Sequence, residues 1–367
     1  MYTNIYEGDK RKIESLYRVK NIDIQIENME AKMKLTRCEE NPIVRPGIYD
    51  WRKATVFNPA VIIENDKFYM YERAAGSLMP FQCYIGLLES DDGIHFKHVV
   101  DEPIITPSMF GFPYGSVQDP RIVKIEDKFY LTYALRPASY GYYPTGVGKP
   151  IEVSPKYPEE WSRPENYLTR SGIMVSEDMI HFEQVAYTTP FEINDRDNIL
   201  FPEKINGKFV LLRRPEEYIG EKYGTDRAGI WICYSEDLIN WTQPKLIAVP
   251  EQEWEFKKIG GSAPPIRTEK GWLTLYHGVD KDNIYRAGVM MLDINNPEKI
   301  LARSKSFILE PEEYYEKFGL YIPDVVFPTA AVVKEGLMYI YYGCTDTAIS
   351  LATVPINELI DFVMAEI

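Results

Sequence analysis

One structural pattern recurs five times along this chain of 367 residues. Each copy has a loop that leads into a proline, a hairpin of alternating residues with a polar tip, and a further apolar strand that ends in a turn. The period is roughly sixty residues, and repeats with three or four strands each are typical of blades stacked around an axis. The five hairpins begin at Asn58-Pro59, Asp119-Pro120, Phe201-Pro202, Pro264-Pro265 and Phe327-Pro328.

This repeat predicts an all-β fold. We expect a five-bladed β-propeller over residues 46–367, with a short C-terminal helix. Residues 1–45 precede the first copy, and within Lys10–Lys34 charged residues mix with leucine, valine and isoleucine. That segment is predicted to form an N-terminal extension, which packs on the propeller or on a neighbouring subunit of a homo-oligomer.

The composition excludes several functional classes. The net charge is −14, so no basic stripe is available to displace counterions from a nucleic acid. No apolar run is long enough to span a membrane, and the polar start MYTNIYEGDKRK is not a signal peptide, which predicts a cytoplasmic protein. The four cysteines are widely spaced and the four histidines form no cluster, so neither disulfides nor a metal site is expected.

The second copy of the repeat contains a candidate acid. Asp119 stands between Gln118 and Pro120, and Arg121 follows it. Proline disfavours helical geometry in the residue before it, so the carboxylate is expected on an extended start of a strand. A lone Asp-Pro can also be a turn in which the aspartate binds nearby amides. Asn58 holds the matched slot of the first copy, which favours a position facing the axis.

Basic residues occupy matched positions in several copies. Arg73 ends the first hairpin, where a cation near the axis would face Asp119. Taken alone, it is better interpreted as a strand residue in an ion pair, and only its matched position in the repeat makes the functional interpretation equally good. The guanidinium fork matches phosphate oxygens at two points, and lysine supplies a point charge. Independent surface ion pairs remain the alternative for each residue, but their convergence in an acidic protein indicates an anion site. The other members of this group are Arg196, Arg214, Lys258 and His277.

The second copy also carries an insertion over residues 136–170. Its first half, PASYGYYPTGVGKP, is rich in tyrosine, glycine and proline and cannot form a long regular strand. Loops of this length are often functional, so we interpret it as a lid or a subunit contact that shapes the substrate entrance. A loop that is merely tolerated is an equally good interpretation.

Several motifs together resemble glycoside hydrolase family 130, the β-mannoside phosphorylases and related β-mannosidases. The resemblance runs from about Thr55 to Val354 and implies a five-bladed propeller that is an enzyme of carbohydrate metabolism. It also implies that the Asp-Pro-Arg aspartate, Asp119, is the catalytic acid. The motifs are NPAVI, QDPRI, LFPEKINGK, PPIRTEKGWLTLYHGV, DVVFP and DTAISLAT.

The resemblance assigns further residues. It implies that phosphate binds to Arg196, Arg214 and Lys258, with His277 and Tyr285 nearby. Some family members have asparagine after the first of these arginines, where this chain has Asp197, a negative charge beside the proposed anion. The residues implied to bind the sugar substrate are Asn58, Arg73, Arg121 and Asp324.

The implied reaction is inverting phosphorolysis of a β-mannoside, giving α-mannose 1-phosphate and a shortened sugar. Phosphate attacks without a base because it is already an anion, and it is the co-substrate of an enzyme that needs no cofactor. One alternative is a hydrolase that uses Asp324 or Glu203 as a second carboxylate, and another is a non-catalytic glycan-binding propeller. The linkage, the acceptor sugar and the preferred chain length stay open.

Overall fold

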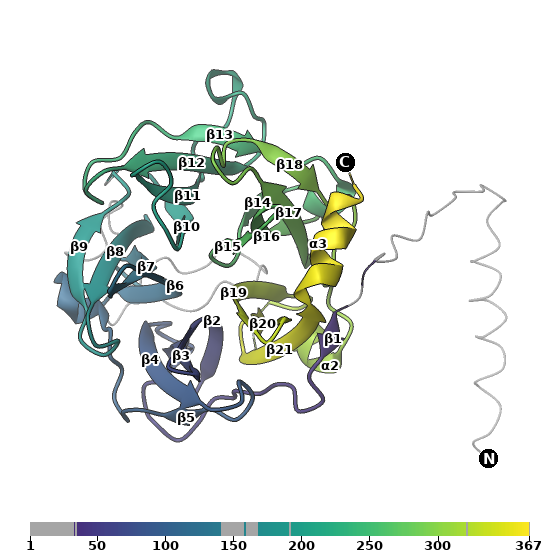
Figure 1. Ribbon diagram of the computed structural model, residues 1–367. Coiled ribbons are helices and arrows are strands. Elements are labelled where there is room, and N and C mark those ends of the chain that lie inside the picture. Colours follow the sequence, from purple (N-terminus) through teal and green to yellow (C-terminus); the bar gives the residue numbers. More distant parts are fainter. Residues whose placement is uncertain are drawn as a thin grey trace, which may run out of the picture. The chain divides into compact units, whose positions relative to one another are not determined.

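Five antiparallel sheets stand around a central axis in the structure, a computed structural model (Figure 1). The structure describes residues 33, 35–140, 158, 168–190, 192–320 and 322–366. The five-bladed propeller predicted from the repeat is confirmed. Most of the predicted N-terminal extension and of the tyrosine-rich insertion lies outside the described residues.

Each blade is a small sheet whose first strand is the one nearest the axis. The first blade consists of β2 (Thr55–Glu64), β3 (Lys67–Ala75), β4 (Cys83–Ser90) and β5 (Lys97–His98). The second consists of β6 (Ser116–Ile125), β7 (Lys128–Arg136), β8 (Arg170–Ser176) and β9 (Glu183–Tyr187). The third consists of β10 (Asp195–Leu200), β11 (Phe209–Pro215), β12 (Ile230–Ser235) and β13 (Lys245–Ala248).

The fourth blade consists of β14 (Lys258–Gly261), β15 (Ile266–Thr268), β16 (Gly271–Val279), β17 (Tyr285–Leu292) and β18 (Ile300–Arg303). Here β14 and β15 both pair with β16, so together they take the place of one inner strand. The fifth blade consists of β19 (Val326–Lys334), β20 (Leu337–Cys344), β21 (Ala348–Pro355) and β1 (Thr36–Arg37). The described part of the chain also has two short α-helices, α2 (Tyr314–Lys317) and α3 (Ile356–Met364). The C-terminal helix expected from the sequence is confirmed by α3.

The ring of blades is closed by β1, a strand that precedes the first blade in the sequence but belongs to the fifth. β1 pairs with β21 and so becomes the outermost strand of the last blade. Arg37 of β1 donates hydrogen bonds from Nε and Nη2 to the two carboxylate oxygens of Glu316, at 2.8 and 3.0 Å. Because the Glu316 side chain is fully buried, this pair fixes the closing strand from inside the protein. The residues just before the first repeat thus belong to the propeller.

Hydrophobic clusters fill the five junctions between neighbouring blades. Alternation along each strand places apolar side chains on both faces of the inner sheets, and each face packs on the next blade. Between the third and fourth blades, Phe201, Trp254 and Trp272 are all at most 1% exposed. Full burial of a large apolar side chain stabilises the fold by about 2–3 kcal/mol, so these junctions hold the blades in place.

A serine–aspartate turn ends the third strand of the first three blades. Asp92 Oδ1 accepts hydrogen bonds from the backbone N–H groups of Ile94 and His95, at 2.8 and 2.9 Å. Asp178 and Asp237 accept the equivalent pairs in the next two blades. Asp and Asn side chains stabilise turns in this way because they replace a backbone acceptor. These are the turns that the repeat predicted.

A β-bulge interrupts the innermost strand of four blades: β19 shifts register between Pro328 and Ala330, and in the other three strands the shift falls at a residue with positive φ. The pairing register shifts at Asn58 in β2, at Asp119 in β6 and at Asp197 in β10. All three residues have positive φ, +46°, +47° and +53°. The extended geometry predicted for Asp119 is therefore wrong, because the extra residue of a bulge leaves the pleated conformation. The matched residue of the third blade is Asp197, not Phe201.

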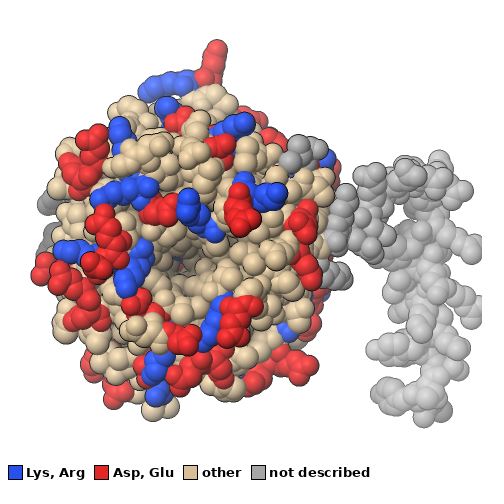
Figure 2. Space-filling model, in the orientation of Figure 1, with Lys and Arg blue, Asp and Glu red and all other residues tan. Residues whose placement is uncertain are grey.

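Figure 2 shows one face of the propeller, hollowed at its centre, with acidic and basic side chains interspersed around the hollow. No single basic patch covers this face. Within the part of the chain that the structure describes, no helix has the length and apolar character needed to cross a membrane. The four cysteines are unpaired, and Cys83, Cys233 and Cys344 are buried.

Replacing Arg37 with methionine tests the closing strand. The change keeps the length of the side chain but leaves the Glu316 carboxylate buried without its cation, and we expect the free energy of unfolding to fall by about 2–4 kcal/mol. Urea unfolding followed by circular dichroism measures it. Lys53→Met is the control: this lysine pairs with Asp50 on the surface, and its loss should change stability by less than about 1 kcal/mol. Equal effects of the two substitutions would contradict the role of Arg37.

Candidate functional site

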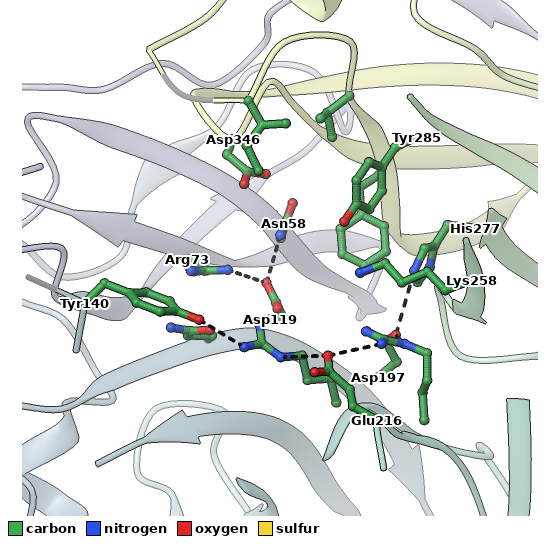
Figure 3. A pocket seen from close by; sticks show the side chains of 16 residues that line it. Asn58, Arg73, Asp119, Tyr140, Asp197, Glu216, Lys258, His277, Tyr285 and Asp346 are labelled. Atoms are coloured by element: carbon green, nitrogen blue, oxygen red, sulfur yellow. Dashed lines mark hydrogen bonds and ion pairs between the residues drawn. The ribbon is translucent and has the colours of Figure 1, made fainter. Parts of the chain in front are cut away.

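A cavity of about 270 Å³ lies where the inner strands meet (Figure 3). Its lining combines charged side chains from the first four blades with apolar and acidic residues around the fifth. Most of the residues predicted from the sequence are among those that line it. The lining residues are Asn58, Arg73, Gln118, Asp119, Tyr140, Arg196, Asp197, Arg214, Glu216, Lys258, His277, Tyr285, Ile322, Val325, Phe327 and Asp346.

Asp119 is held by the first blade. Its Oδ1 atom accepts hydrogen bonds from Asn58 Nδ2 and Arg73 Nη1, both at 2.8 Å (Figure 3). The other oxygen, Oδ2, makes no hydrogen bond with the described residues. Burial works to raise the pKa of Asp119, but the charges of Arg73 and Arg121 and the bond from Asn58 hold it below its usual value. Asp119 is therefore ionised in the free protein at neutral pH.

The two partners of Asp119 are themselves fixed by close packing. The Arg73 guanidinium stacks over the Phe57 ring, 4.2 Å from its centroid, and Nε contacts Cys83 Sγ at 3.4 Å. A Cβ atom on Gly343 would lie 2.1 Å from Asn58 Oδ1. Glycine is thus required at this point of β20 for Asn58 to reach Asp119.

Arg121 occupies a place different from the one expected. It is not among the residues that line the cavity. Its Nε donates to the backbone carbonyl of Ser262, and its Nη1 donates to the carbonyls of Asp119 and Pro120 at 3.0 Å. Arg121 therefore joins the second blade to the fourth and supplies positive charge behind Asp119, instead of presenting a group to the cavity.

The three predicted cations converge on one part of the cavity. Arg196 donates from Nη2 to Thr169 Oγ1 at 2.9 Å, and Arg214 donates from Nε to Asp197 Oδ2 at 2.7 Å. Lys258 Nζ lies 5.5 Å from the centroid of the Tyr285 ring. Among the described residues, no carboxylate lies within ion-pair distance of Lys258. Its charge is thus available to a bound anion.

His277 stands beside the cations without a charge of its own. Burial, opposed by Asp197 and assisted by the charges of Arg214 and Lys258, lowers the pKa of His277 to about 3. Its ring stacks on Tyr285, with centroids 5.9 Å apart and planes 16° from parallel. A Cβ atom on Gly260 would lie 2.3 Å from Asp197 Oδ2 and 2.5 Å from His277 Cε1. This glycine lets the third and fourth blades meet at the cations.

Two carboxylates singled out from the sequence lie elsewhere. Asp324 does not line the cavity, and its backbone carbonyl accepts the Tyr285 N–H at 3.1 Å. Glu203 is paired with Arg267 at 3.1 Å on the surface, where 46% of its side chain is exposed. The cavity instead contains further residues for which no individual role was predicted, among them the polar residues Tyr140, Glu216 and Asp346.

Sequence signals for these three residues existed but were weak. Asp346 opens the motif DTAISLAT, and Tyr140 belongs to the tyrosine-rich segment. Glu216 follows Arg214 by two residues, the spacing that puts side chains on the same face of an extended segment. Charged residues are too frequent in this chain for that spacing alone to identify a site residue.

A family model described as β-1,4-mannooligosaccharide phosphorylase matches residues 18–365. The chain belongs to glycoside hydrolase family 130. The resemblance found in the sequence motifs is therefore confirmed, and the propeller is an enzyme of this family of glycoside phosphorylases.

Relatives in the family cover nearly the whole chain. A 1,2-β-oligomannan phosphorylase of Thermoanaerobacter sp. is 35% identical over 334 residues, which are 89% of this chain and 99% of the relative. A β-1,4-mannooligosaccharide phosphorylase of Ruminococcus albus is 30% identical over 358 residues, 94% of this chain and 95% of the relative. The solved β-1,2-mannobiose phosphorylase of Listeria innocua superposes with a TM-score of 0.73 at 24% identity, over 91% of this chain and 100% of that one, and shares the fold.

The low pKa of His277 predicts a pH dependence of stability. The unfolded chain binds a proton near pH 6.5, whereas the folded protein does not until about pH 3. Stability from the neutral ring is thus full above pH 6.5 and is lost as the pH falls towards 3. The slope of unfolding free energy against pH measures how many protons are taken up on unfolding. In His277→Gln this uptake should be smaller between pH 3 and 6.5 by up to about one proton, so the plot should be shallower. Equal slopes in the two proteins would show that His277 titrates normally.

Proposed function

We propose that this protein catalyses the inverting phosphorolysis of β-mannosides, giving α-mannose 1-phosphate and a shortened sugar. The observation that carries the proposal is the composition of the cavity. One carboxylate with an open oxygen, Asp119, shares it with three cations, Arg196, Arg214 and Lys258. The named activities of the family relatives support the same reaction class.

The reaction needs one acid and a bound anion. An oxygen of phosphate attacks the anomeric carbon on the face opposite the leaving group, the bond from that carbon to the glycosidic oxygen breaks, and the leaving oxygen takes a proton. Arg196, Arg214 and Lys258 hold the phosphate in line and lower its electrostatic repulsion with the incoming sugar oxygens. Phosphate already carries the charge that water would need a base to produce.

Asp119 supplies the proton through a hydroxyl of the bound mannose. It is ionised in the free protein, so it must gain its proton when the substrates bind. A phosphate anion beside the carboxylate raises its pKa, since like charges disfavour the ionised form and oppose the effect of Arg73 and Arg121. After bond cleavage the phosphate ester gives up its own proton, which restores the acid, so protons balance over one turnover.

The mannosyl unit is proposed to lie against the first and fifth blades. Asn58 and Arg73 point into the cavity beside Asp119, and Figure 3 places Asp346 near Asn58. Carboxylate and amide groups suit the paired hydroxyls of a sugar because each can bridge two of them. We propose Asp346 as the fifth-blade contact, in place of Asp324.

For the linkage, we propose β-1,2. The Thermoanaerobacter relatives named for β-1,2 substrates are 35% and 36% identical to this chain, whereas the Ruminococcus albus relative named for β-1,4 substrates is 30% identical. Assays with β-1,2- and β-1,4-mannobiose compare the two directly. A higher kcat/KM for the 1,4 isomer would reverse the assignment.

Asp119→Asn tests the acid. The amide keeps the shape and the bond to Asn58 but cannot donate an acidic proton, so formation of mannose 1-phosphate should fall by ~10³-fold. The assay measures mannose 1-phosphate and free mannose from mannobiose, with and without phosphate. Glu203→Gln is the control and should keep full activity. Free mannose produced at the same rate without phosphate would make the protein a hydrolase and refute the proposal.

Arg196→Gln tests the anion site. The variant loses one charge and the bidentate fork, and kcat/KM for phosphate should fall by ~10²-fold. KM for the mannoside should change little, because the substitution is on the phosphate side of the cavity. Arg267→Gln removes an exposed arginine of the third and fourth blade junction and serves as the matched control. An equal loss of affinity for both substrates would indicate general disruption of the cavity.

A further inference from the structure

A carboxylate stands among the cations of the proposed phosphate site. Glu216 Oε1 lies 3.2 Å from Arg214 Nη1 and 3.5 Å from Arg196 Nε, so it touches both guanidinium groups (Figure 3). Arg196 Nε is buried and makes no hydrogen bond within the described part of the chain. An anion that satisfies this donor and Arg214 must therefore bind next to Glu216.

Glu216 is held in this place by the third blade. It directly follows β11, and Asn194 Nδ2 donates a hydrogen bond to Glu216 Oε2 at 2.5 Å. The Glu216 backbone N–H donates to the Asn194 carbonyl at 2.9 Å. These two bonds fix the carboxylate from the side away from the arginines. Glu216 Oε1 consequently faces the proposed anion position, and hydrogen bonds to Asn194 hold it there.

Asp197 also lies near the cations, but its carboxylate is already hydrogen-bonded and buried. Its Oδ2 already accepts the bond from Arg214 Nε at 2.7 Å, and only 4% of its side chain is exposed. The Glu216 side chain is 34% exposed, within a cavity that it lines. Of the two carboxylates, Glu216 is the one that a bound anion can contact.

Glu216 is ionised when it meets that anion. Burial favours the neutral acid, but the charges of Arg196, Arg214 and Lys258 hold the pKa of Glu216 below its ordinary value. An ionised carboxylate can only accept hydrogen bonds. A neighbouring oxyanion must therefore supply a hydrogen, because two facing acceptors without a proton repel each other and remain desolvated.

We propose that Glu216 makes the anion site selective for phosphate over sulfate by accepting a hydrogen bond from the P–OH group. Phosphate retains at least one hydrogen at neutral pH, whereas sulfate has none, although the two anions have the same shape. The inference rests on the proposed function, which places phosphate on Arg196 and Arg214. A site built around a hydrogen bond rejects an analogue that lacks the donor because its own polar group is then left unpaired.

A simpler role would give a different pattern. If Glu216 only occupied the arginines as a competing internal anion, its removal would strengthen the binding of phosphate and sulfate alike. The ratio of the two dissociation constants would not change. Selectivity for a protonated oxyanion instead predicts that removal of the carboxylate strengthens sulfate binding far more than phosphate binding. The ratio is thus the decisive quantity.

The experiment measures Kd for inorganic phosphate and for sulfate by calorimetry at pH 7.5, without sugar. The wild type should prefer phosphate by ~10²-fold, and Glu216→Gln should reduce the preference by at least ~10-fold because the amide donates to sulfate. Glu216→Ala, which removes the acceptor without adding a donor, should reduce it as well. Glu217→Gln is the matched control: it removes an adjacent charge outside the cavity lining and should keep the wild-type ratio.

The outcomes separate the two proposals. An unchanged ratio in both Glu216 variants, with phosphate still bound, overturns the role of Glu216 and leaves the proposed function intact. Failure of the wild type to bind phosphate, or to form mannose 1-phosphate from any mannobiose, overturns both. Sulfate inhibition of turnover gives a second readout, and it should appear at ~10-fold lower sulfate in Glu216→Gln than in the wild type.

Discussion

The site depends on an interruption in the hydrogen-bond ladder of the innermost strands. At Asn58, Asp119 and Asp197 the ladder shifts by a residue and the backbone adopts positive φ. Such a conformation costs about 1–2 kcal/mol for a residue other than glycine and is mildest for asparagine and aspartate. The ladder then resumes, so the strain is stored within a well-paired sheet. As a result of these bulges, three short polar side chains lie at the axis.

Charge balance is the second constraint. The cavity brings arginines and carboxylates together, and several of these charges are paired, such as Arg73 with Asp119 and Arg214 with Asp197. A buried charge without its partner is strongly destabilising. Lys258, which has no such partner among the described residues, and neutral His277 leave the phosphate side with a surplus of positive charge. The surplus is local, within a protein whose overall charge is −14.

The sequence was sufficient for the architecture and for part of the site. The alternation of apolar and polar residues recurs in every strand, so the five blades could be predicted from it. The matched positions of Arg196, Arg214 and Lys258 in the repeat then indicated that these cations lie near the axis. β1 is only two residues long, and its pairing with β21 depends on the whole ring closing, which no local pattern records. The bulge geometry of Asp119 was hidden because proline suggested an extended residue. Asp346 lies in the turn between β20 and β21, and Glu216 directly follows β11. Charged residues are too frequent in this chain for such positions alone to identify them as site residues.

Ring closure has a consequence for the time at which the cavity can exist. The closing contact joins Thr36 to Thr353, positions 317 residues apart in the sequence. During synthesis the earlier blades can assemble as they emerge, but β1, although it is made first, has no strand to pair with until β21 has left the ribosome. Contacts between positions so far apart in the sequence form slowly, because closing the long intervening loop costs conformational entropy before any contact can stabilise it. A truncated or stalled chain would therefore carry every cation of the anion site on blades that never close around the axis.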